Sequence, residues 1–523
     1  MVENQQKTGA RGLLDTAIVG CLFIFAAVAP HSIAATQSIW LIGMLLWVVR
    51  FAFKPRPVVY RTPVDYFLLG FFILSGFAAL LSYEPLVSIG KLRAASLFTI
   101  VYLVAENVRS LRIVRLLAVT LIASCMLNVL YTAGERLLGR GVKVYGVSEA
   151  SPLYQAGARD GDTLLEVDGT KLEDPQELVN AISKPDQQPV KLVIYRHEWQ
   201  PTFRISRGTV LPGNTAIEQL GVSSWTKGRD WRASGFFGHY VTYAEVLQFV
   251  LALTLGLFVS LLIKRSWAGA LLFIALVGFT FALVLTVTRA VWLGCLVSTL
   301  IILLLAVRRR TLIAIGLLAI PLIIAGLFIL QQKRNVGFFD SNDGSTTWRE
   351  TVWREGFSLL VSKPRHLLIG VGMDSIKGHW REWGLFDGGR IPKGHMHSNF
   401  LQIALERGLP ALILWLGFMF VYARTLWSCL RERQKLHWMD RGILLGALGG
   451  LVGFFLSGIV HYNWGDSEVV MVFYFIMGLV LTIHRQLSAV NCKKTGEVSV
   501  TVARSRGSFR QLFFSVVVAD LVG

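Results

Sequence analysis

Two histidines, His395 and His397, stand in the segment 394–400, directly before a long apolar stretch. Histidine exchanges a proton near neutral pH and can therefore act as a general base. Polar groups at membrane depth are costly unless they face a cavity or a partner. Because the rest of the chain is mostly apolar, we interpret this segment as the reacting end of a membrane enzyme.

Further cationic side chains flank predicted helices that end on the same side of the membrane. Arg232 and His239 lead into one helix, Arg289 joins two others, and Arg349 and Arg354 lie on an amphipathic helix in a long loop. The planar guanidinium group binds phosphate oxygens in pairs and stays charged. We therefore expect these segments to lie on the same side of the membrane as the two histidines.

The composition predicts a polytopic membrane protein. Hydrophobic residues make up 53% of the 523 residues and charged residues only 16%. The net charge of +19 gathers in short clusters between apolar runs, which is the pattern of the positive-inside rule and not that of a nucleic-acid-binding surface. The five cysteines show no paired spacing, so we expect no disulfide framework, no metal site and no cofactor.

Apolar runs long enough to cross the bilayer predict an all-α fold of about twelve membrane-spanning helices. The runs are 13–34, 37–53, 65–82, 93–106, 112–131, 238–262, 267–287, 290–307, 311–330, 400–423, 442–461 and 468–485. We take the first as a retained helix and not a cleaved signal peptide. If the basic clusters lie on the cytoplasmic side, both termini are also cytoplasmic. The loops 132–237, 331–399 and 462–467 then lie on the outer side of the membrane.

One outer loop has the composition of a small α/β domain. Its sequence is similar to that of a bacterial PDZ domain, with a helix expected over 174–183 and a strand over 190–195. The resemblance rests on the pairs Ser151-Pro152, Ala156-Gly157, Gly161-Asp162 and Asp168-Gly169. PDZ domains bind an extended peptide at a sheet edge. The expected carboxylate-binding loop, 138–142, departs from the usual form, so a structural spacer is the alternative to peptide binding.

These features predict four regions along the chain. Residues 1–137 hold the first five membrane helices, 138–207 the PDZ-like domain, 208–490 the remaining helices with the outer loop 331–399, and 491–523 a cytoplasmic tail.

Residues 230–485 resemble the O-antigen ligase and polymerase family of bacterial envelope proteins. The resemblance rests on four motifs in the family's order, namely Arg232…Gly235-Phe236…His239, Thr288-Arg289-Ala290-x-Trp292, Arg349…Trp353 before Pro364…Gly370-x-Gly372, and His397-Ser398…Leu401-Gln402…Gly408-Leu409. It implies a GT-C-like membrane fold in the bacterial inner membrane. It also implies transfer of a glycan from an undecaprenyl diphosphate carrier to an acceptor at the periplasmic face, where the PDZ-like domain would also lie.

The resemblance implies roles for individual residues. His397 is expected to be the general base, and Arg289 to stabilise the departing diphosphate. The expected substrate-binding residues are Arg232, His239, Arg349, Arg354, His395, Asn399 and Gln402.

Each assignment has a structural alternative. Arg289 could be a snorkelling charge at the membrane edge, and His397 a helix-start residue with a satisfied ring. Ser398 or Asn399 could be the N-cap of the following helix. Arg349 and Arg354 could pair with Glu350 and Glu355, and Asp374 could be a turn residue.

A metal site is a further alternative, because a metal could in principle be chelated by His379, His395 and His397. No Asp-x-Asp or Glu-x-x-His motif accompanies these histidines.

Several functions fit this reading. The first is ligation of O-antigen to the lipid A-core. The others in the same class are O-antigen polymerisation and protein O-glycosylation. In protein O-glycosylation the PDZ-like domain would hold the protein acceptor. A non-catalytic scaffold is the alternative outside the class. An intramembrane protease is disfavoured because the His-Glu-x-x-His motif is absent. A transporter is disfavoured because we see no internal repeats.

Overall fold

The computed structural model describes residues 9–186, 188–196, 200–261, 266–314, 316–317, 344–391, 393–432 and 436–495. Its chain contacts divide it into two compact units. The helical unit comprises residues 1–125, 244–277 and 289–523, and the sheet unit comprises 126–243 and 278–288. Each unit is described by itself. Most of the predicted span at 311–330 and most of the predicted tail lie outside the described residues.

Within the described residues, ten helical segments are long and apolar enough to cross a membrane. They are α2 (Ala10–Val28), α3 (Ile33–Arg50), the irregular stretch Pro85–Asn107, α8 (Leu111–Leu138), α12 (Tyr240–Leu261), α13 (Trp267–Leu285), α14 (Arg289–Ala306), α19 (Asn399–Arg431), α20 (Trp438–Val460) and α21 (Ser467–Thr495). A shorter apolar helix, α4, spans Asp65–Leu80. The predicted polytopic helical fold is therefore confirmed.

The predicted span at 93–106 is part of a longer and less regular stretch. Pro85–Asn107 consists of α5 (Pro85–Gly90), α6 (Leu92–Ala95), the 3-10 helix η2 (Ser96–Phe98) and α7 (Thr99–Asn107). Pro85 starts the stretch because its missing N–H is tolerated in the first helical turn.

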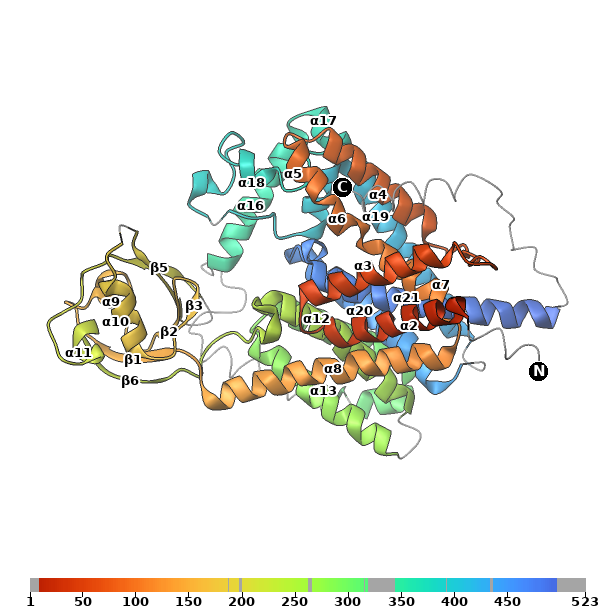
Figure 1. Cartoon of the computed structure of the whole chain (residues 1–523), viewed down its shortest axis with the longest axis horizontal. Helices are drawn as coiled ribbons and strands as arrows, with labels where there is room; N and C mark the ends of the chain where they lie inside the picture. The colour runs from red at the N-terminus through yellow and green to blue at the C-terminus, as the bar shows by residue number, and fades with distance from the viewer. Residues whose placement is uncertain are drawn as a thin grey trace. The chain divides into compact units, whose positions relative to one another are not determined.

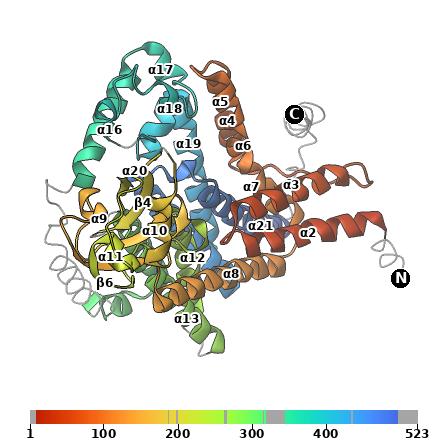
Figure 2. The same cartoon turned by 60° about the vertical axis from the view of Figure 1, so that its left-hand side comes forward.

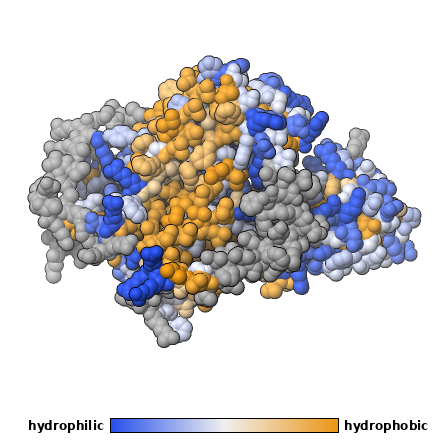
Figure 3. All heavy atoms as spheres, turned by 180° about the vertical axis from the view of Figure 1, so that it is seen from behind, coloured by the Kyte–Doolittle hydropathy of each residue, from blue (hydrophilic) through white to orange (hydrophobic). Residues whose placement is uncertain are grey.

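The surface of the helical unit is strongly apolar. Figure 3 shows a broad hydrophobic area over the helices with hydrophilic residues at its edges. Large apolar side chains such as Leu271, Ile413 and Phe420 are exposed on the helices of this unit. Such a surface suits helices that face lipid and not water.

The helical unit is built by pairwise packing of helices. α14 packs along α20, α2 along α3, α19 along α4 and α21 along α7. Glycines let two backbones approach closely between α12 and α20, because a Cβ atom added to Gly446 would lie 2.4 Å from the Cα atom of Leu253. Small residues serve the same purpose at many membrane helix interfaces.

The outer loop predicted at 331–399 is an ordered helical cap from residue 344 onward. It contains α16 (Gly344–Val361), α17 (Pro364–Leu368) and α18 (Ile376–His379), which group at one end of α19 in both views (Figures 1 and 2). Its side chains share one buried core, which includes Val352, Leu359, Trp380, Met396 and Leu405. The cap is therefore packed onto the start of α19.

Helix α19 is interrupted in its N-terminal third. Gly408 adopts φ 81° and ψ 166°, and Pro410 follows inside the helix. The interruption frees backbone carbonyls, and two of them accept hydrogen bonds from the cap: Val371 N donates to Leu405 O at 2.8 Å and Gly372 N donates to Glu406 O at 3.0 Å. The broken turn thus joins α19 to the 371–372 turn.

The sheet unit contains a six-stranded antiparallel sheet with the order β5-β4-β2-β1-β6, and β3 pairs with β2. The strands are β1 (Val142–Val147), β2 (Thr163–Val167), β3 (Thr170–Lys171), β4 (Val190–Tyr195), β5 (Thr202–Ile205) and β6 (Val222–Lys227). Since β6 pairs with β1 along its length, the sheet continues beyond residue 207. β5 and β6 form its two edges.

Three short helices, α9 (Pro152–Gln155), α10 (Pro175–Ser183) and α11 (Ala216–Leu220), complete the sheet unit (Figure 2). Asp174 caps α10 by accepting a hydrogen bond from Gln176 N at 2.8 Å, and Pro175 occupies its first turn. Leu178 and Ile182, one turn apart, are buried against the sheet core. The predicted helix at 174–183 and strand at 190–195 are confirmed by α10 and β4.

The interruption of α19 generates a stability prediction. Gly408→Ala should lower the free energy of unfolding by about 3 kcal/mol, because its backbone conformation is essentially restricted to glycine. A Cβ atom there would also lie 2.4 Å from Leu368 O. The matched control is Gly76→Ala in α4, where an added Cβ meets nothing within 4 Å. Thermal unfolding of the detergent-solubilised proteins measures both, and equal midpoints for the two variants would contradict the prediction.

Candidate active site

His395 and His397 lie side by side in a tight turn before α19. The His397 N–H donates to His395 Nδ1 at 3.1 Å, and the two ring centroids are 4.0 Å apart. His397 has a φ of 46°, which is uncommon for a residue with a side chain. Such a conformation persists only where the surroundings fix it, and this is a frequent property of functional sites.

The residue between the histidines is held by two helices. Met396 is buried, its N–H donates to Gln402 Oε1 at 2.7 Å, and its carbonyl accepts from Trp353 Nε1 at 2.9 Å. Gln402 belongs to α19 and Trp353 to α16. The helices on either side therefore fix the orientation of the histidine turn.

A cation lies next to the histidine turn. The Trp348 ring meets the His397 ring edge to face, with centroids 4.5 Å apart. The Arg349 guanidinium lies over the same tryptophan, 5.1 Å from its ring centroid. The structure thus brings Arg349, His395 and His397 together around Trp348.

Arg354 lies further along α16 and is exposed. The carboxylate of its neighbour Glu355 accepts hydrogen bonds from Phe386 N at 2.7 Å and Asp387 N at 3.1 Å. Glu355 thus stabilises the backbone of the cap at residues 386 and 387.

Asn399 is buried as the first residue of α19. Its Nδ2 donates to Asn463 Oδ1, and its Oδ1 accepts from Trp464 N at 3.0 Å. Ser398 occupies the N-cap position but makes no capping hydrogen bond through its side chain. Both ends of the Asn399 amide are used inside the protein, and its role in substrate binding stays a prediction.

Three residues beneath the histidine turn were missed by the sequence analysis. Glu406, Arg407 and Tyr462 form a hydrogen-bonded group: Arg407 Nη1 donates to Glu406 Oε2 at 2.9 Å, and Tyr462 Oη donates to the same oxygen at 3.1 Å. A signal was present, because two adjacent charged residues inside an apolar span are unusual and generally functional. Tyr462 carries no comparable signal.

Asp374 and His379 lie in the cap. Asp374 is a turn residue with a φ of 63°. Burial tends to raise the pKa of Asp374, but hydrogen bonds from Lys377 and Lys91 hold the pKa below its usual range. His379 contacts Glu382 at 2.8 Å and Glu84 at 3.4 Å. Among the described residues, no group of three or more His, Cys, Asp or Glu side chains is arranged to hold a metal ion.

The remaining predicted arginines, Arg289 and Arg232, belong to different units. Arg289 is partly buried as the first residue of α14 in the helical unit. In the sheet unit, Arg232 Nη2 donates to Val287 O at 2.6 Å. The Arg232 guanidinium lies 4.1 Å from the centroid of the Tyr240 ring, on which His239 stacks at 4.8 Å. The sheet unit therefore groups Arg232 with His239.

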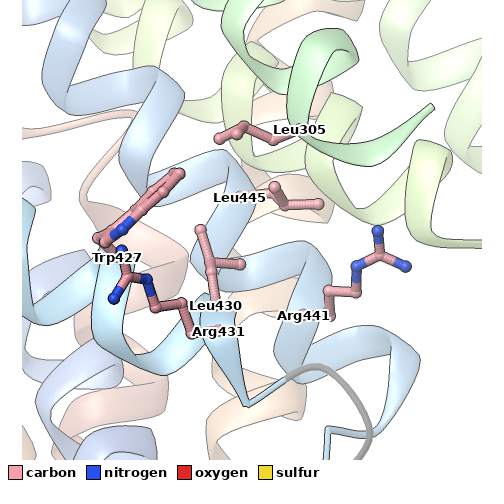
Figure 4. Close-up of a pocket in the computed structure, with 6 residues that line it drawn as sticks. All are labelled: Leu305, Trp427, Leu430, Arg431, Arg441 and Leu445. Atoms are coloured by element: carbon pink, nitrogen blue, oxygen red, sulfur yellow. The ribbon is translucent and has the colours of Figure 1, made fainter. Parts of the chain in front are cut away.

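A small pocket lies elsewhere in the helical unit. It has a volume of about 30 Å³, room for about one water molecule. Its lining residues are Leu305, Trp427, Leu430, Arg431, Arg441 and Leu445 (Figure 4). It includes none of the predicted site residues.

Two parts of the chain match models of known protein families. Residues 273–416 match the family model for O-antigen ligase. The resemblance to the O-antigen ligase family is therefore confirmed over this region, which contains Arg289, Arg349, the histidine turn and Glu406. Residues 143–196 match the PDZ domain model, which confirms the inserted domain. No curated protein matches the chain.

The match supports glycan transfer in lipopolysaccharide biosynthesis. Together with the ten apolar helices among the described residues, it implies a multi-pass membrane protein whose matched region is glycosyltransferase-like.

The contacts of Asn399 generate a second prediction. Asn399→Ala should lower the free energy of unfolding by about 2 kcal/mol, because two buried hydrogen bonds are lost and their partners stay unsatisfied. Asn107→Ala is the control, since Asn107 makes a single bond to the carbonyl of Leu103 at the end of α7. Thermal unfolding in detergent measures both. An Asn399→Ala protein as stable as the wild type would show that these bonds are dispensable.

Proposed function

We propose that this protein transfers a glycan from an undecaprenyl diphosphate carrier to a hydroxyl group of the lipid A-core, at the periplasmic face of the inner membrane. The observation that carries the proposal is the histidine turn, which lies inside the matched ligase region and beside Arg349. The distribution of basic clusters supports a periplasmic location for this end of α19.

The chemistry requires a base and fixed cations. The acceptor oxygen forms a bond to the anomeric carbon, and the bond from that carbon to the diphosphate oxygen breaks. In the proposal His397 receives the proton of the acceptor hydroxyl. The negative charge that develops on the diphosphate is stabilised by arginine, which stays protonated and binds two oxygens at once.

We assign Arg289 as the principal cation on the diphosphate. Arg349 is supported as a second cation by its place beside His397 across Trp348. Arg232, His239 and His395 are proposed to orient the donor or acceptor, and Arg354 to contact the substrate from the exposed face of α16.

The PDZ domain favours a second candidate function, transfer of the glycan to a protein. In the same sheet, beyond the matched PDZ residues, the edge strand β6 pairs with β1 alone among the described strands, and its Ser223, Ser224, Thr226 and Lys227 are not buried. An extended peptide can pair with such an edge. A protein acceptor held at this edge would be recognised through its backbone, whereas the lipid A-core would be recognised through its sugars.

Complementation tests the primary proposal. The wild-type gene should restore O-antigen on the lipid A-core of a ligase-deficient, O-antigen-producing host, and His397→Asn should reduce the product at least about 100-fold because asparagine cannot accept the proton. Asparagine tolerates the positive φ of residue 397, so the turn is retained. Lipopolysaccharide gels, normalised to membrane expression, give the measurement.

The matched control is His437→Asn. His437 caps α20 by accepting a hydrogen bond from Met439 N at 3.2 Å, and asparagine preserves this cap. This variant should ligate like the wild type. Full product from His397→Asn would remove His397 from the mechanism. Glycoprotein gels of the same strains report the second candidate, since a glycosylated protein without ligated lipopolysaccharide would favour a protein acceptor.

A separate prediction concerns the diphosphate. Arg289→Ala should lower the rate of transfer by about 100-fold or more, and Arg289→Lys should recover only part of it, because lysine supplies a charge but not the planar fork. Arg112→Ala, at an exposed basic position at the start of α8, is the control for membrane topology. The measurement is the ligation rate in isolated membranes. Equal rates for Arg289→Ala and Arg112→Ala would identify Arg289 as a topological charge only.

A further inference from the structure

Three consecutive side chains after α20 bind two other helices of the helical unit, α12 and α19. His461 Nδ1 lies 3.0 Å from Glu245 Oε1 of α12. Tyr462 Oη donates to Glu406 Oε2 of α19 at 3.1 Å. The third side chain, Asn463, accepts the hydrogen bond from the first residue of α19. The 461–463 segment therefore fixes α12 and α19 against the end of α20.

The carboxylate of Glu406 is fully occupied. Its Oε1 accepts from Gln402 Nε2 at 2.9 Å and from Asp374 N at 3.1 Å. Its Oε2 accepts from Arg407 Nη1 at 2.9 Å and from Tyr462 Oη at 3.1 Å. An ionised carboxylate has about four acceptor positions, and all four are used here.

This carboxylate is connected to the histidine turn by two routes. Through Gln402, whose Oε1 accepts from Met396 N at 2.7 Å, it reaches the backbone between the histidines. Through Tyr462, whose ring centroid is 5.5 Å from that of His395, it reaches a histidine ring. The turn is therefore supported at its backbone and at its side chain by one buried group.

The group is shielded from water. Gln402, Glu406 and Arg407 are only 2%, 4% and 8% exposed. Burial, and then the negative charge of Glu406, raise the pKa of Tyr462, so its hydroxyl stays a donor at neutral pH. A hydrogen bond lost in such surroundings is not replaced by water, and the geometry that it enforces is lost with it.

We propose that Tyr462 and Glu406 are positioning residues of the glycan transfer reaction, holding the histidine turn in its reactive geometry. The proposal rests on the function proposed above, in which His397 is the base. Displacement of a reacting group by about 1 Å can lower a rate about 100-fold, so a group that fixes the base affects turnover more than substrate binding. A group that only stabilises the fold would lower stability without this selective effect.

The test uses Tyr462→Phe, which removes one hydroxyl and keeps the ring against His395. Tyr102→Phe is a matched control, because Tyr102 Oη donates to the carboxylate of Asp65 at 2.8 Å in a buried part of α7. Both variants lose a phenol-to-carboxylate hydrogen bond, which is buried at Tyr102 and part-buried at Tyr462. Only the first of these bonds connects to the histidine turn.

The purified full-length proteins are assayed in lipid nanodiscs. The donor is undecaprenyl diphosphate-linked O-antigen, and the acceptor is lipid A-core from a ligase-deficient strain. Tyr462→Phe should lower kcat by about 10- to 100-fold and change KM less than about threefold. Tyr102→Phe should keep kcat within about twofold of the wild type, and thermal unfolding of both variants should show a comparable loss of stability.

Gln402→Met provides a second variant if Tyr462→Phe does not fold. It removes the other route from Glu406 to the turn and should also lower kcat with little change in KM. A wild-type kcat for either folded variant would overturn the proposal, and so would an equal loss of kcat in Tyr102→Phe. Activity retained by His397→Asn in the same assay would instead show that the proposed base, and the function built on it, is wrong.

Discussion

The geometry of the candidate site depends on a buried carboxylate, that of Glu406 in α19. Removal of a carboxylate from water is costly unless hydrogen bonds and an opposite charge compensate it. Here four donors do so, and they come from α19 itself, from the turn at Asp374 and from the segment that follows α20. Because these donors must converge on one group, the segments that carry them have little freedom relative to one another. Gln402 bonds both to Glu406 and to the backbone of the histidine turn, so the turn is held in place by the same group.

The interruption of α19 makes this arrangement possible. In an uninterrupted helix the carbonyl of Leu405 would accept from the N–H of Leu409, whereas the residue four positions after Glu406 is Pro410, which has no N–H to donate. At Gly408 the helix breaks, and those carbonyls accept from Val371 and Gly372 instead. The cap is thereby tied to the membrane helix by backbone bonds as well as by its buried core. α16, which carries Trp348 and Trp353, belongs to the same core, so the contacts of the histidine turn follow from one local break in a helix.

Most of the fold could be predicted because the length of an apolar run decides a membrane helix without reference to its neighbours. The PDZ domain could be predicted from local turn residues, and α10 has its own capping signal in Asp174-Pro175. His395 and His397 stand out by residue type alone. The partners of the turn could not be predicted, because Tyr462 and Glu406 are 56 residues apart and meet only through helix packing. β6 was missed because its two serines and a threonine give no clear strand pattern.

The sheet unit shows why residue type alone does not fix a role. Arg232 was predicted to bind substrate, yet one of its nitrogens donates to the carbonyl of Val287. Val287 is β-branched and has a φ of 52°, a conformation that is costly unless it is held. Ala233 N adds a second bond to the same turn through Leu285 O. Arg232 therefore supports the backbone of this turn. Its buried Nε makes no hydrogen bond within the described part of the chain. The contact with Val287 O is thus a structural role that residue type alone did not predict.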